Sequence, residues 1–105
     1  MTSFADRERG FEAQFARDAE LQFRVMARRD KLLGLWAAGQ LGLGTDEAEA
    51  YAKTVVQADF KEAGDEDVIR KVCADLATKG LSEHEVRQAL VHCAAEARRQ
   101  IMEAI

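Results

Sequence analysis

The sequence contains no proline, and it has only two cysteines and two histidines among 105 residues. Proline breaks or kinks helices, so its absence leaves long helices uninterrupted. Alanine, glutamate, arginine, leucine and lysine are abundant, and these side chains lose little freedom on entering a helix. The sequence therefore predicts an all-α protein. Its length suits one domain that buries its core without disulfides or metal.

Motifs for catalysis and cofactor binding are missing as well. The sequence has no glycine-rich phosphate loop with a lysine, no paired-cysteine motif, no His-Glu-x-x-His and no serine nucleophile beside a base and an acid. His84, His92, Cys73 and Cys93 are candidate metal ligands, but His92 and Cys93 are adjacent and point about 100° apart on a helix. We therefore expect no enzyme activity, no metal and no cofactor, and two reduced thiols in the core.

Long apolar runs and a basic surface are also absent. The uncharged, mostly apolar stretch at residues 32–44 has 13 residues, whereas a membrane-spanning helix needs about 20. The chain opens with charged residues instead of a signal peptide. Residues 45–105 carry 13 acidic and eight basic side chains, which argues against a surface that binds phosphate backbones. We expect a cytoplasmic protein without direct membrane insertion and without a nucleic-acid partner.

Three helices are predicted after residue 44. Thr45, Asp65 and Ser82 are candidate N-caps, and Gly64 and Gly80 are candidate helix stops. Apolar residues recur at steps of three or four in each segment: Ala48, Tyr51, Ala52, Val55 and Val56; Ile69, Val72, Cys73 and Leu76; Val86, Leu90, Cys93, Ala94, Ala97, Ile101 and Ile105. With the preceding segment, in which Trp36 is the expected core anchor, they predict a four-helix bundle over residues 19–105.

The first 18 residues differ from the rest, because Phe4, Phe11 and Phe15 lie in a highly charged segment. They keep helical spacing through Ala19 and Met26 to Leu33, which predicts one helix of about 35 residues. The other helices are too short to cover its first half. We therefore predict a mobile arm over residues 1–18 that folds into a partner's groove. Packing back onto the bundle or into a dimer explains the pattern equally well. Residues 27–31, within the short basic cluster at residues 24–31, are expected to be a solvated helix face.

Three long runs have an unusual composition: FADRERGFEAQFARDAELQF at residues 4–23, ARRDKLLGLWAA at residues 27–38 and EAYAKTVVQADFKEAGDEDVIRKV at residues 49–72. In these runs and in their order, the chain closely resembles the α-proteobacterial zeta subunit, the inhibitor of the rotary ATP synthase. The resemblance covers essentially the whole chain, although the last helix is similar in pattern more than in letters.

The resemblance implies a four-helix protein that binds the catalytic head of the ATP synthase and blocks ATP hydrolysis. In that family the N-terminal segment, mobile when free, enters a catalytic interface between α and β subunits and stops hydrolytic rotation. Carried onto this chain, the expected partner-binding residues are Phe4, Arg7, Phe11, Phe15 and Arg17. The γ subunit is a further candidate contact. Gly10 departs from what a stable helix prefers, so the free arm is expected to be loose.

Two alternatives from other classes of protein stay open. A structural module that self-associates through its phenylalanines would change size with concentration, and this change would be lost when Phe11 and Phe15 become alanine. A small nucleotide-binding bundle would show a saturable ligand response near Trp36. If the chain is an inhibitor, we expect it to be monomeric when free and to bind its partner through the arm.

Overall fold

The computed structural model describes residues 19–59 and 64–104. It contains α2 (Ala19–Leu41), α3 (Thr45–Asp59), α4 (Glu66–Leu76), the short 3-10 helix η1 (Ala77–Lys79) and α5 (Glu83–Glu103). All regular structure in the described ranges is helical, which confirms the predicted all-α class and its four helices. Residues 1–18, predicted to be an arm, lie outside these ranges.

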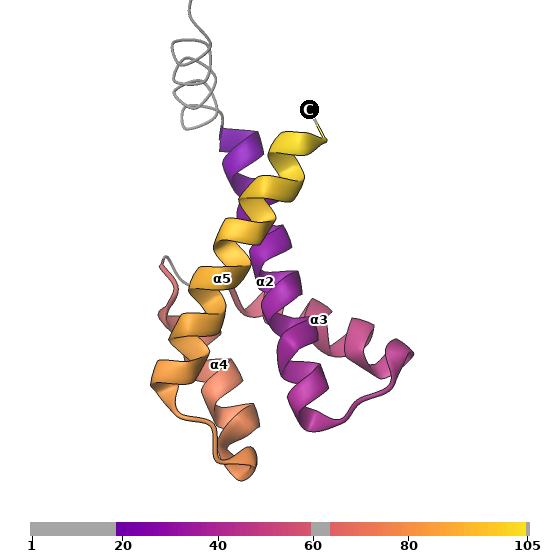
Figure 1. Cartoon of the computed structure of the whole chain (residues 1–105), viewed down its shortest axis with the longest axis vertical. Coiled ribbons are helices and arrows are strands. Elements are labelled where there is room, and N and C mark those ends of the chain that lie inside the picture. Colours follow the sequence, from indigo (N-terminus) through magenta and orange to yellow (C-terminus); the bar gives the residue numbers. More distant parts are fainter. Residues whose placement is uncertain (1–18, 60–63, 105) are drawn as a thin grey trace, which may run out of the picture.

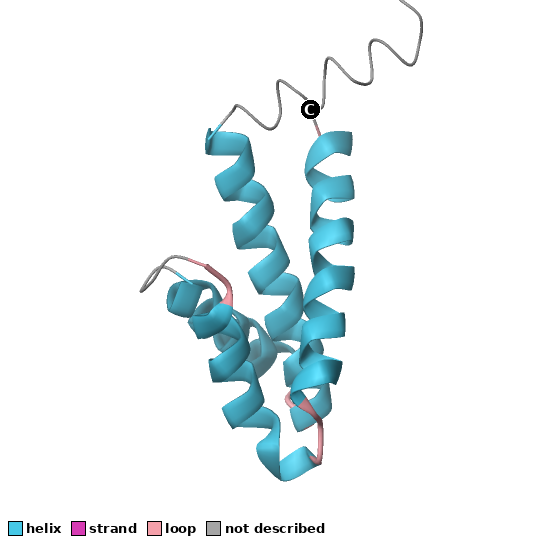
Figure 2. Ribbon diagram, turned by 90° about the vertical axis from the view of Figure 1, so that its left-hand side faces the viewer, coloured by secondary structure: helices cyan, strands magenta, loops and turns pink. Residues whose placement is uncertain are grey.

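The two longest helices, α2 and α5, run along the long axis of the molecule (Figures 1 and 2). Helix α2 packs against both α3 and α5, and α4 packs against α3 and α5 toward one end. The first turn of α2 and the last turn of α5 both lie at the opposite end, where the two helices diverge from each other (Figures 1 and 2). Short connections at residues 42–44 and 80–82 join consecutive helices, as the turn signals predicted.

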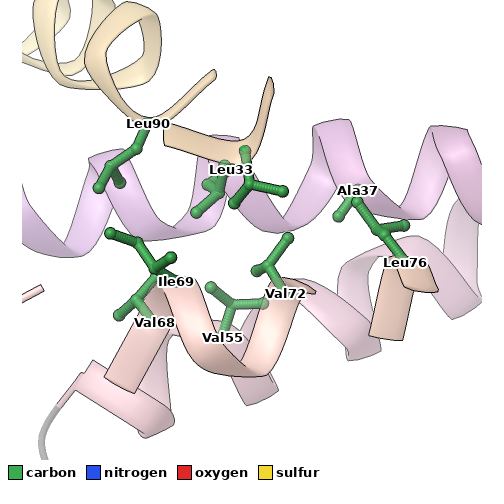
Figure 3. Close-up of a cluster of buried hydrophobic side chains, with 9 residues drawn as sticks. Leu33, Ala37, Val55, Val68, Ile69, Val72, Leu76 and Leu90 are labelled. Carbon is green, nitrogen blue, oxygen red and sulfur yellow. The ribbon is translucent and has the colours of Figure 1, made fainter. Parts of the chain in front are cut away.

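The core is a cluster of aliphatic side chains from all four helices (Figure 3). Its buried members are Leu33, Ala37, Val55, Val68, Ile69, Val72, Leu76, Val86 and Leu90. The apolar spacing of α4 and α5 predicted most of them. Trp36, Tyr51, Cys73 and Cys93 are half-buried and pack against the edge of this cluster, so Trp36 contacts the core without being enclosed by it.

The predicted stripe on α2 is buried only in its last part. The spacing from the phenylalanines through Ala19 and Met26 to Leu33 was expected to form one apolar face; Leu33 is fully buried, but Ala19 is exposed and Met26 is 40% exposed. Met26 and Leu33 lie seven residues apart and share one face of the helix, so the bundle covers this face only from Arg29 onward. The buried residues of α2 are Arg29, Asp30, Leu33, Gly34, Ala37 and Ala38.

The helix ends follow the predictions in part. Ser82 caps α5, since its Oγ accepts a hydrogen bond from the Glu85 backbone N–H at 3.2 Å, and Gly80 ends the preceding turn with φ of 73°. Thr45 is not a cap, because α3 begins at Thr45 itself and the Gly44 carbonyl accepts from Ala48 N–H at 2.8 Å. Asp65 occupies the N-cap position of α4, but its side chain makes no capping bond.

The Asp65 side chain does not cap α4 because its carboxylate pairs with Arg29. Arg29 is buried and lies at the centre of an ionic cluster. The Arg29 guanidinium lies 2.9 Å from Asp30 Oδ1, 2.9 Å from Asp65 Oδ1 and 3.4 Å from Asp59 Oδ2. These partners place the end of α3 and the start of α4 against α2. The prediction that residues 27–31 form a solvated face is therefore wrong at Arg29, which is only 7% exposed.

Helices α2 and α3 cross closely at Gly34. A Cβ atom at Gly34 would lie 2.6 Å from the Ala52 Cα atom and 3.0 Å from the Ala52 Cβ atom. No real side chain tolerates a backbone contact that short, so this crossing depends on glycine in α2 and alanine in α3. Gly39, one turn further along α2, has no atom within 4 Å of its would-be Cβ.

We expect Gly34→Ala to lower the free energy of unfolding by about 1–3 kcal/mol, because the new methyl forces the two helices apart. The matched variant Gly39→Ala, in the same helix and in open space, should instead stabilise by up to about 1 kcal/mol through helix propensity. Urea denaturation of both variants measures the difference. Equal effects at the two positions would contradict the close crossing.

The ionic cluster also predicts a pH dependence. Burial is the main cause that raises the pKa of Asp30 to about 8; a hydrogen bond with Asp59 raises it further, and Arg29 opposes the shift. The Asp59 Oδ1 atom is buried without a donor among the described residues, and a proton on Asp30 supplies one. The folded state thus holds a proton that an unfolded aspartate, with a pKa of about 3.9, has released.

The free energy of unfolding should therefore fall as pH rises from about 4 to about 8, by at most about 1.4 kcal/mol per pH unit for this proton. Below this range Asp30 is protonated in both states, and above it Asp30 is ionised in both states, so the dependence vanishes. Asp30→Asn removes the titration and should flatten the slope, whereas exposed Asp46→Asn should leave it unchanged. Thermal unfolding across this pH range tests the assignment, and an unaltered slope in Asp30→Asn would refute it.

Candidate functional site

The five residues predicted to bind a partner all lie outside the described ranges. These are Phe4, Arg7, Phe11, Phe15 and Arg17. The described structure therefore neither brings them together nor separates them. It does describe the element that follows them, since α2 begins at Ala19, directly after the predicted arm.

The first turns of α2 expose apolar side chains beside charged ones. Phe23 is 54% exposed and Met26 is 40% exposed, whereas Arg24 Nη2 pairs with Glu20 Oε1 at 2.9 Å. Large apolar groups exposed near one another are a common feature of interaction surfaces. The beginning of α2 thus has the features of a contact surface.

A groove lies next to this end of α2, and we call it the cationic groove. It consists of two adjoining hollows of about 480 and 260 Å³ that share Lys31 and Val56. Its apolar lining is Phe23, Ala27, Ala52, Val56 and Ile101, and its polar lining is Arg24, Arg28, Lys31, Glu49, Lys53 and Gln57. Sequence reasoning missed this groove, because its walls come from α2, α3 and α5. The basic run at residues 24–31 was the one local signal.

Tyr51, Lys71 and Asp75 form a small polar cluster between two helices. The Tyr51 hydroxyl donates to Asp75 Oδ2 at 2.8 Å, and the Lys71 ammonium contacts the same carboxylate at 3.0 Å. Burial, more than the neighbouring Asp75, raises the pKa of Tyr51. This arrangement joins α3 to α4.

The cysteines and histidines form no joint site. Cys73 and Cys93 are free thiols, and burial raises the pKa of each, which makes them poor nucleophiles. His84 and His92 lie on the exposed side of α5. Within residues 19–59 and 64–104, no group of three or more histidine, cysteine or acidic side chains could hold a metal ion. No helix in these ranges is long and apolar enough to cross a membrane.

Comparisons with known proteins supply the identity of the family. A family model described as ATPase inhibitor subunit zeta matches residues 1–100. A solved structure entitled "Solution NMR structure of the protein" is 52% identical and superposes with a TM-score of 0.74; the match covers 81% of this chain and 99% of that chain. No curated protein matches the chain. The chain therefore belongs to the ATPase inhibitor subunit zeta family, and it is a regulatory protein of an ATPase and not a catalyst.

Proposed function

We propose that this protein inhibits ATP hydrolysis by the rotary ATP synthase by inserting residues 1–18 into an interface between the α and β subunits of the catalytic head. The observation that carries the proposal is the family match, which extends over the arm as well as the bundle. The protein would be cytoplasmic and monomeric when free, and it would meet the inner membrane only through the ATP synthase.

The composition of the core supports a division into an arm, residues 1–18, and a bundle, residues 19–105. The buried aliphatic cluster draws its members from α2, α3, α4 and α5. These four helices bury one another's apolar side chains, so on this proposal the phenylalanines of residues 1–18 would be available for a partner. A segment that orders only on binding loses conformational entropy at that moment, and buried aromatic side chains can offset the loss.

The mechanism requires no chemistry from the inhibitor. A helix wedged between two subunits holds the head in one rotary state only to the extent that it binds that state more tightly than the others. Phe4, Phe11 and Phe15 would fill apolar pockets, while Arg7 and Arg17 would pair with carboxylates at the interface. The γ subunit, which passes through the head, is a further candidate contact for the inserted helix.

The proposed division predicts where stability resides. Leu76→Ala should lower the free energy of unfolding by about 2–5 kcal/mol, because Leu76 is fully buried in the core cluster. Phe11→Ala should leave the unfolding transition nearly unchanged, since the arm would make no contribution to the bundle. Thermal or urea denaturation of both variants measures the two changes in the free energy of unfolding. A large loss in Phe11→Ala would show that the arm belongs to the core.

The function itself is tested by titrating the protein against the cognate catalytic head during ATP hydrolysis. A shortened chain that begins at Glu20 should fold and fail to inhibit. In the full chain, Phe11→Ala and Phe15→Ala should each weaken inhibition by about 1.5–3 kcal/mol, or about 10- to 150-fold, if each ring is buried by the partner.

The control for these variants is Val91→Ala, which truncates an apolar side chain that is 67% exposed on α5. It should inhibit like the unaltered protein. If the shortened chain inhibits as strongly as the full chain, the arm is not the inhibitory element. If the full chain does not inhibit at all, the proposed function is wrong.

A further inference from the structure

The cationic groove has a charge opposite to that of the protein as a whole. The chain carries a net charge of −4, yet the groove is lined by four cations, Arg24, Arg28, Lys31 and Lys53, and by one acidic residue, Glu49. Arg24, Arg28 and Lys31 are spaced by four and three residues, so they share one face of α2. A local concentration of positive charge on an acidic protein favours an acidic partner.

The ion pairs and hydrogen bonds that these cations make within the protein are weak, so a binding partner can replace them. Arg24 pairs with Glu20 in an exposed i,i+4 pair, Lys31 lies 3.7 Å from Glu49, and Arg28 donates to the neutral side chain of Gln100 at 2.8 Å. Exposed ion pairs of this kind contribute little to stability. Carboxylates of an incoming partner could replace them at little cost.

The apolar lining selects a protein segment over a small anion. Ala27, Val56 and Ile101 are half-buried and face the groove beside exposed Phe23. A phosphate or nucleotide phosphate would satisfy the cations but would leave this apolar surface covered by water. An amphipathic helix that carries both apolar and acidic side chains satisfies both parts of the groove.

We propose that the cationic groove binds an acidic amphipathic helix on the same catalytic head that receives the arm, as a second contact. This inference rests on the proposed function. Phe23, in the groove, follows Ala19 by four residues, or about 6 Å along α2. Insertion of residues 1–18 therefore brings the groove against the surface of the head, and the partner's apolar side chains fill it while its carboxylates meet Arg28 and Lys53.

The test reverses the charge of two basic residues in the groove and compares this double variant with one in which two basic residues elsewhere on the surface are reversed. The groove variant is Arg28→Glu with Lys53→Glu; the control is Arg70→Glu with Lys79→Glu, on exposed positions of α4 and η1. Each double variant changes the net charge equally. Both full-length proteins are titrated against the cognate head during ATP hydrolysis, at roughly 0.03 M and 0.3 M salt.

We expect the groove variant to need about 10- to 100-fold more protein for half-inhibition at low salt, and the gap to narrow at high salt as charges are screened. The control should stay within about twofold of the unaltered protein. Melting midpoints verify folding, and if Arg28→Glu with Lys53→Glu unfolds, the neutral pair Arg28→Gln with Lys53→Gln replaces it with a smaller effect of the same sign.

Three results would overturn the inference while leaving the proposed function intact. The groove and control variants could weaken inhibition equally, which would reveal a general charge effect, or neither could weaken it. The unaltered chain could also form a dimer in sedimentation that the groove variant abolishes, which would make a second copy the occupant. Failure of the unaltered chain to inhibit would instead overturn the proposed function.

Discussion

One buried guanidinium holds the bundle together at the point where three helices meet. Arg29 lies on α2, and its carboxylate partners lie beside it on α2, at the last residue of α3 and at the residue before α4. A buried cation is tolerated only when it is paired and hydrogen-bonded. This requirement fixes where α3 must end and where α4 must begin, and it explains why Asp65 gives up the capping bond that its position would allow.

The second constraint is the close contact of α2 and α3 at Gly34. With Ala52 opposite, the two backbones approach so nearly that neither helix can slide without a clash. The Arg29 cluster joins the same two helices five residues earlier on α2. Together these contacts hold the middle of α2 against α3, while the first turns of α2 project beyond α4 (Figures 1 and 2). The exposed start of α2 and the cationic groove occupy that projecting end.

The sequence predicted the parts of the fold that depend on local signals. Ser82 and Gly80 predicted the start of α5, because an N-cap and a glycine with positive φ depend only on residues within one turn. The spacing of Ile69, Val72 and Leu76 predicted the buried face of α4. Contacts between distant residues could not be predicted in this way. Arg29 appeared to belong to a solvated basic run because Asp59 and Asp65 lie 30 and 36 residues away. The groove was hidden for the same reason.

The two long helices place both ends of the bundle on one side of the molecule, since α2 starts where α5 finishes (Figure 1). Any domain, tag or fluorophore joined after α5 therefore lies at the same end of the molecule as the start of α2. The turn at Gly80, between η1 and α5, lies at the far end and is exposed. That turn is the better attachment point for a label or for a fusion partner, because a cargo placed there stays clear of the first turns of α2 and of the cationic groove.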